Sequence, residues 1–89
     1  MKGVHLRIGG KVQGVFFRAF TRDLANSLGI CGFVQNEPDG SVTVEAEGPA
    51  ERIQSFIEGL RTGPPRAKVM TFALEEQPEK GYVGFELRR

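Results

Sequence analysis

The sequence predicts an α+β fold in which one antiparallel sheet carries two helices on a single face. Two observations support this prediction. Segments of alternating or continuous apolar residues, typical of strands, are separated by turn-forming glycine and proline. Two further segments repeat apolar residues every three or four positions, as amphipathic helices do. The elements follow in the order β-α-β-β-α-β, and a short strand comes last.

The first strand is expected over residues 4–8, where apolar residues alternate with polar ones. A glycine-containing loop follows it. The first helix is expected from about Arg18 to Leu28, because its apolar residues recur at helical spacing. Gly29, directly after it, is suited to cap the C-terminus of the helix.

A β-hairpin should follow this helix. Its strands are expected over Cys31–Asn36 and over residues 42–47. The segment Glu37-Pro38-Asp39-Gly40 between them is a turn sequence, because proline presets one backbone angle and glycine accepts a positive φ. The two strands should therefore pair directly.

The second half of the chain repeats this alternation. A helix is expected from about Pro49 to Leu60, and Gly63-Pro64-Pro65 ends it. A fourth strand is expected over residues 67–74, a loop over residues 77–81 and a short last strand over residues 83–87.

This order of elements predicts the ferredoxin-like α/β sandwich, in which right-handed crossovers place both helices on one face of the sheet. The expected strand order is 4-1-3-2, and the sequence does not specify where the last strand pairs. The first and second strands then run parallel with the third between them, so Asn36 should lie at the same edge as the glycine loop and Arg18. The expected core consists of Leu6, Ile8, Phe20, Leu24, Leu28, Val42, Val44, Ile53, Phe56, Ile57 and Leu60.

The other face of the sheet is expected to be open and polar. Its side chains should be His5, Arg7, Thr43, Glu45 and Glu47. Arg7 is expected to pair with Glu45 or Glu47, a contact worth roughly 0–1 kcal/mol when exposed.

Composition limits the classes of function. The 89 residues suit a single domain over 1–89, and 12 basic against 11 acidic residues leave a net charge of +1, which argues against a nucleic-acid-binding surface. One cysteine, Cys31, excludes an internal disulfide and a cysteine-rich metal site. No apolar run reaches membrane-spanning length and no signal peptide is visible, so a cytoplasmic protein without a membrane partner is expected.

The most informative segment runs from Gly9 to Arg18. Its glycines let the backbone turn tightly and approach a ligand closely. Arg18 stands where the first helix begins, and the helix dipole disfavours a cation there. A bound anion would remove this conflict, because the N–H groups of a helix N-terminus and a guanidinium both attract phosphate. The segment therefore predicts a phosphate-binding site.

Two segments resemble the signatures of the acylphosphatase family. Residues 10–18, with the sequence GKVQGVFFR, are similar to the signature loop of that family, and residues 32–40, GFVQNEPDG, are similar to its second signature. Similarity extends over nearly the whole chain. Two motifs in the right order are far more specific than a lone glycine pattern.

The resemblance implies catalytic roles for two residues: Arg18 would hold the phosphoryl group of an acyl phosphate, and Asn36 would orient the attacking water. The reaction implied is hydrolysis of the carboxyl–phosphate bond to a carboxylate and inorganic phosphate. It would be carried out by a monomer on a small-molecule substrate, with no metal and no organic cofactor. The remaining implied phosphate contacts are the backbone amides of Gln13, Gly14, Val15, Phe16 and Phe17.

Two other functions stay open. The chain could be a non-enzymatic phosphate or carbamoyl-phosphate binding module of a larger maturation enzyme, as acylphosphatase-like domains are known to form. Its start at Met1 and its end soon after the last strand favour a free-standing enzyme. It could also be an RNA-binding ferredoxin-like domain, although Glu45 and Glu47 on the open face would repel a phosphate backbone.

Each site residue also has a plainer interpretation. Arg18 alone could be a solvated surface residue, and Asn36 alone could belong to the following turn. Their combination with the glycine loop favours the functional interpretation. Phe16 and Phe17 are expected to be packing residues, and no motif specifies the acyl part of the substrate.

Overall fold

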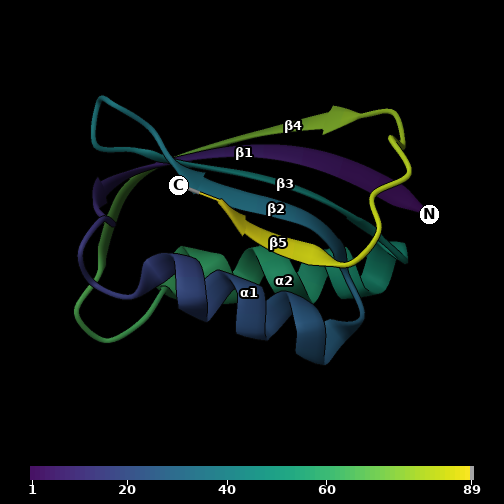
Figure 1. Ribbon diagram of the computed structural model, residues 1–89, viewed down its shortest axis with the longest axis horizontal. Coiled ribbons are helices and arrows are strands. Elements are labelled where there is room, and N and C mark those ends of the chain that lie inside the picture. Colours follow the sequence, from purple (N-terminus) through teal and green to yellow (C-terminus); the bar gives the residue numbers. More distant parts are fainter. Residues whose placement is uncertain (89) are drawn as a thin grey trace.

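A computed structural model describes residues 1–88 and confirms the α+β fold. Its sheet lies on one side and both helices pack against the same face of that sheet (Figure 1). The predicted elements are all present, with ends shifted by a few residues. Their bounds are β1 Lys2–Lys11, α1 Phe17–Leu28, β2 Cys31–Asn36, β3 Val42–Gly48, α2 Ala50–Thr62, β4 Lys68–Gln77 and β5 Phe85–Arg88.

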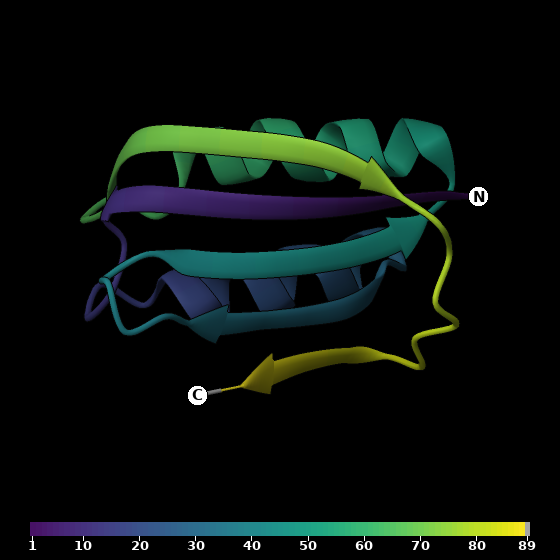
Figure 2. The same ribbon diagram turned by 90° about the horizontal axis from the view of Figure 1, so that it is seen from above.

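The strand order is β4-β1-β3-β2-β5, so the predicted order of the first four strands is confirmed (Figure 2). The last strand, β5, joins the free edge of β2 and runs parallel to it, with Val34 opposite Leu87. The sheet is therefore mixed, whereas the sequence indicated an antiparallel one. Four residues carry too little pattern to select an edge or a direction.

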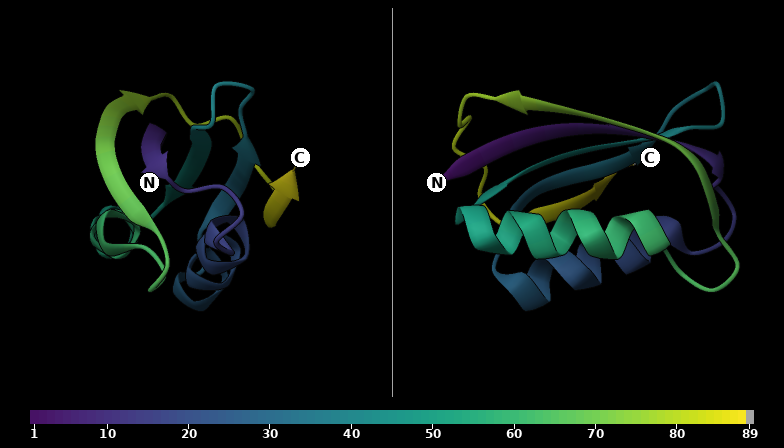
Figure 3. Two further views of the ribbon diagram at one scale, coloured as in Figure 1. Left: turned by 90° about the vertical axis from the view of Figure 1, so that its left-hand side faces the viewer. Right: turned by 180° about the vertical axis from the view of Figure 1, so that it is seen from behind.

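The apolar core lies between the sheet and the two helices, with α1 over β2 and β5 and α2 over β3 and β4 (Figure 3). Most predicted core residues are fully buried. Phe20, Leu24 and Leu28 of α1 are only partly buried and pack against this core, with Leu24 next to Gly59 of α2. Three residues of the loop and the helix start fill the core instead, namely Val12, Val15 and Phe17.

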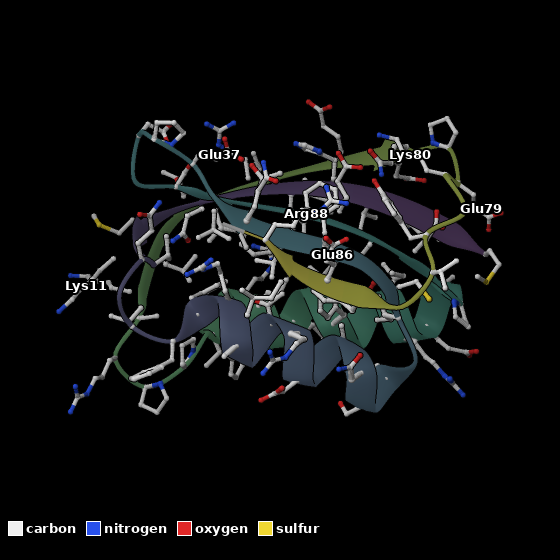
Figure 4. The ribbon with its side chains drawn as sticks, in the orientation of Figure 1. Lys11, Glu37, Glu79, Lys80, Glu86 and Arg88 are labelled. Carbon is white, nitrogen blue, oxygen red and sulfur yellow. The ribbon has the colours of Figure 1, made fainter. Side chains whose placement is uncertain are left out.

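The face of the sheet away from the helices is polar, as predicted, but it is not open. The segment over residues 78–84, which joins β4 to β5, crosses this face and covers Glu45 and Glu47. Both glutamates are consequently buried, with 9% and 5% of their surface exposed. Figure 4 shows Lys80 of this segment on the side of the sheet opposite the helices.

The ion pair predicted for Arg7 is wrong. Arg7 donates from Nη2 to Asp39 Oδ2 at 3.1 Å and from Nε to Ser41 Oγ at 2.7 Å. Both partners lie in or after the turn between β2 and β3, at the far end of the strand from Glu47. Glu45 pairs instead with His5, whose Nδ1 lies 3.0 Å from Glu45 Oε2.

No helix within residues 1–88 is long and apolar enough to cross a membrane.

Candidate active site

The sequence placed the ends of the first and second strands at one edge, and the structure confirms this. Because β1 and β2 each pair antiparallel to β3, they run in the same direction and finish at the same end of the sheet (Figure 2). The start of α1 and the end of β5 reach this end as well (Figure 1). A pocket of about 260 Å³ opens between these four segments. Its lining residues are Val12, Gly14, Phe16, Phe17, Arg18, Ala19, Asn36 and Leu87.

The loop between β1 and α1 presents its backbone N–H groups without using them. Gly14 has a φ of 72°, and Phe16 has a φ of 62°, so two residues of the loop adopt the left-handed region. None of the N–H groups of residues 13–19 has a hydrogen-bond acceptor among residues 1–88. Successive unpaired amides in such a loop form a concave site suited to an anion.

The N-terminus of α1 adds to this electropositive site. Phe16 occupies the cap position and makes no side-chain hydrogen bond to the helix. The first turn contains no acidic residue, although carboxylates are the usual partners of a helix N-terminus. The partial positive charge of the helix end therefore faces the pocket uncompensated by the chain.

Arg18 is fixed by the last strand. Its Nη1 donates to the backbone carbonyl of Arg88 at 2.7 Å, and its side chain is half-buried in the pocket wall. No carboxylate side chain within residues 1–88 forms an ion pair with it. One edge of the guanidinium is thus used for positioning, and the rest of its charge is available to a ligand.

The end of β5 is held in place from the opposite face of the sheet. The guanidinium carbon of Arg88 lies 4.0 Å from the centroid of the Phe33 ring, in a cation–π contact. Figure 4 shows the Arg88 side chain over β2 on that face. No sequence pattern indicates this role of β5, because the contact to Arg18 is made by a backbone carbonyl, which any residue type possesses.

Asn36 lies at the end of β2, where its partner in the ladder is Val42. Its side chain lines the pocket, and its Oδ1 is buried with no hydrogen-bond partner among the described residues. A buried carbonyl oxygen without a partner costs about 1–3 kcal/mol, so native proteins rarely leave one unpaired without a reason. A water bound in the pocket would remove this cost.

Two predicted contact residues do not line the pocket with their side chains. Val15 is buried in the core. Gln13 points to the neighbouring turn, where its Nε2 donates to the carbonyls of Glu37 and Ser41, at 2.9 Å each. Gln13 therefore ties the glycine loop to the β2–β3 turn, a role that the sequence did not indicate.

Phe17 packs in the core, as predicted, whereas the packing role predicted for Phe16 is wrong. Phe16 is 77% exposed, because its left-handed backbone turns the side chain away from the core. Both residues nevertheless line the pocket.

The pocket lacks negative charge. No acidic side chain within residues 1–88 lines it. The carboxylate of Asp39 lines a different hollow, where it accepts hydrogen bonds from the side chain and the backbone of Ser41 that lower its pKa to about 2. The described residues also contain no group of three or more His, Cys, Asp or Glu side chains placed to bind a metal ion.

These features define a small α+β protein with a pocket at one end of its sheet. The pocket combines unpaired backbone amides, a guanidinium and an unpaired carboxamide oxygen. Residues 4–87 match the acylphosphatase family model. An acylphosphatase of Salinibacter ruber is 46% identical over 89 residues, covering 99% of this chain and 94% of that protein. The crystal structure of the Bacillus subtilis acylphosphatase has a TM-score of 0.95 and 35% identity, with 98% of both chains covered. This chain belongs to the acylphosphatase family.

The family resemblance of the two signature segments is thereby confirmed, together with the enzyme class that it implied. A larger protein is also similar. The structure of full-length HypF in its phosphate- and nucleotide-bound form matches with a TM-score of 0.87 and 27% identity, covering 97% of this chain and 11% of that one.

Proposed function

We propose that this protein hydrolyses small acyl phosphates to a carboxylate and inorganic phosphate, using Arg18 and Asn36 as its catalytic residues. The observation that carries the proposal is the convergence of three features in one pocket. These are the unpaired amides of residues 13–19, the carboxylate-free guanidinium of Arg18 and the orphaned Oδ1 of Asn36. Each is an unusual feature alone, and a phosphoryl group with an attacking water accounts for all three.

The phosphoryl group would be held by charge and by fixed dipoles. A planar guanidinium can donate to two phosphate oxygens at once, and it keeps its charge at every physiological pH. The amides of Gly14 to Phe17 would surround the remaining oxygens, assisted by the N-terminus of α1. Because the fold fixes these donors in advance, little reorganisation is needed as negative charge develops in the transition state.

Asn36 would act on the water rather than on the phosphate. A carboxamide is not a base at neutral pH, but its Oδ1 accepts a hydrogen bond and can hold a water in line with the bond to be broken. The water oxygen forms a bond to phosphorus, and the bond between phosphorus and the acyl oxygen breaks. The carboxylate leaves with the electron pair, and the water proton passes to solvent. This leaving group is already stable as an anion, so the reaction needs positioning and charge stabilisation rather than a general acid.

The proposal also covers the domain organisation, oligomeric state, location and cofactor requirement of the protein. We infer a single domain over residues 1–89 that works as a cytoplasmic monomer on small-molecule substrates, without a metal or organic cofactor. A non-enzymatic module that only binds phosphate or carbamoyl phosphate is the competing function, and its pocket would be the same one. RNA binding is disfavoured, because the buried Glu45 and Glu47 and the covering segment 78–84 occupy the sheet face that such domains use.

Hydrolysis of acetyl phosphate in the presence of a chelator tests the proposal. The parent protein should release phosphate, and Arg18→Ala should lower kcat/KM roughly 100-fold or more, as loss of a transition-state donor does. Arg22→Ala is the matched control, because Arg22 lies one helical turn further along and, among residues 1–88, pairs only with Asp23. A parent protein that binds phosphate but releases none from acetyl phosphate would establish the binding module instead.

The role of Asn36 needs its own measurement. Asn36→Ala should lower kcat with little change in KM, because the side chain would position water and not the substrate. Equal losses in kcat and in apparent affinity would show that Asn36 binds the phosphoryl group. Size-exclusion chromatography with light scattering gives the oligomeric state.

A further inference from the structure

The pocket is also lined by apolar side chains that phosphate binding does not require. These are Val12, Phe16, Phe17 and Leu87. Val12 and Phe17 are buried in the core, so their presence in the wall follows from packing. Leu87 is partly buried and also packs against the core. Core packing does not account for Phe16, which lies in the loop and is largely exposed.

Phe16 is costly where it stands. It is the non-glycine residue with a positive φ, 62°, among residues 1–88, and an L side chain in that region costs about 1–2 kcal/mol. A glycine would adopt the same backbone without strain. The side chain gains little from packing, since 77% of its surface is exposed and its ring makes no aromatic pair with Phe17 or Phe20, which pair with each other. Neither the local conformation nor the core therefore accounts for a phenylalanine.

We propose that Phe16 is a specificity-determining residue that binds the acyl part of the substrate, and that it favours apolar acyl groups, above all aromatic ones. This inference rests on the proposed function. An acyl phosphate has a charged phosphoryl end and a carbon end, and the pocket lining offers both polar groups and apolar side chains. With the phosphoryl group on the amides and Arg18, the carbon end would meet the apolar wall that Phe16 and Leu87 contribute to the pocket.

The chemistry of this wall selects a class of acyl group. An exposed ring offers a large rigid surface on which an aromatic or branched acyl group packs, with centroids about 4.5–7 Å apart for an aromatic pair. A second carboxylate or a hydroxyl on the acyl group would find no partner there. Benzoyl phosphate should accordingly be a better substrate than acetyl phosphate, and a dicarboxylic monophosphate such as succinyl phosphate should gain nothing from the wall.

The test compares benzoyl and acetyl phosphate on the parent protein and on Phe16→Ala. The ratio of kcat/KM for benzoyl phosphate to that for acetyl phosphate should fall roughly fivefold, the effect expected of one aromatic contact. The fall should lie mainly in KM for benzoyl phosphate, because the acyl contact is the same before and during the reaction. Val83→Ala is the control, since Val83 is 98% exposed and lies outside the pocket, and it should leave the ratio unchanged.

A second variant separates the ring from the backbone strain. Phe16→Gly removes the ring and also relaxes the left-handed residue, so it folds at least as readily as the parent at this position. It should show the same fall in the ratio as Phe16→Ala. A parallel loss on both substrates in both variants would overturn the inference and assign Phe16 to the shape of the loop alone. A parent protein inactive on both substrates would overturn the proposed function itself.

Discussion

Replacing Glu45 by glutamine should destabilise the fold by about 3 kcal/mol at neutral pH. Glu45 is a buried carboxylate on β3, with 12% of its side chain exposed. Its Oε1 accepts hydrogen bonds from Tyr82, Gln77 and Lys80, and its Oε2 pairs with His5. Glutamine has nearly the same shape but carries no charge, so it isolates the electrostatic part of these contacts.

The pKa of Glu45 gives the magnitude. Burial raises this pKa, but the hydrogen bonds from Tyr82, Gln77, His5 and Lys80 outweigh burial and lower it to about 2 from an ordinary 4.5. That difference corresponds to about 3 kcal/mol of folding free energy at neutral pH, as an upper value. Because the pKa is lower in the folded protein, the contribution is complete above about pH 4.5. It is lost as the pH falls toward 2.

Urea unfolding of the parent and of Glu45→Gln at pH 7 and pH 3 tests this reasoning. The two proteins should differ most at pH 7, and the difference should shrink to roughly half or less at pH 3, where Glu45 is protonated on unfolding. Glu76→Gln serves as control, because Glu76 is exposed and makes no hydrogen bond with another described side chain. A difference that stays the same at both pH values would refute the electrostatic account and assign the loss to packing.

Other variants test the loop and the strand pairing. Gln13→Ala should lose about 1–2 kcal/mol of stability in urea unfolding, because it removes both hydrogen bonds to the β2–β3 turn. The KM for acetyl phosphate should rise as well, because the loop is held less firmly. An unchanged unfolding midpoint would mean that these two hydrogen bonds contribute nothing to stability. Gly32→Ala should abolish folding by circular dichroism, since its Cβ would stand 1.9 Å from the Glu45 carbonyl and its φ is 147°. Gly40→Ala is the control, because Gly40 has a φ of 92° but no atom lies within 4 Å of the added Cβ. It should lower the free energy of unfolding by only about 1 kcal/mol. Equal effects of the two alanines would contradict the close approach at Gly32.

The sequence predicted the elements and the convergence at the pocket for a common reason. Apolar spacing marks each strand and helix, and the order of the elements leaves few ways to connect them. Placing β3 between β1 and β2 then brings Asn36 to the glycine loop without any knowledge of the side chains. Arg18 was identifiable because a cation at a helix N-terminus conflicts with the helix dipole.

Features that depend on long-range contacts could not be predicted in this way. Three such features depend on where the last strand pairs. They are the pairing of β5 with β2, the hydrogen bond from Arg18 to the Arg88 carbonyl and the covering of Glu45. That placement is decided by many weak contacts rather than by a local pattern. The sequence predicts a packing role for Phe16 because aromatic residues usually pack, whereas the structure gives it a positive φ and leaves its ring exposed.

Binding of inorganic phosphate, followed by amide and side-chain NMR shifts, tests the central claim most directly. The largest shifts should fall on the backbone amides of Gly14 to Ala19 and on the side chains of Arg18 and Asn36. They should disappear in Arg18→Ala at the same phosphate concentration. Shifts centred on Arg7 and Ser41, which line a second hollow at the β2–β3 turn, would place the phosphate elsewhere and contradict the account.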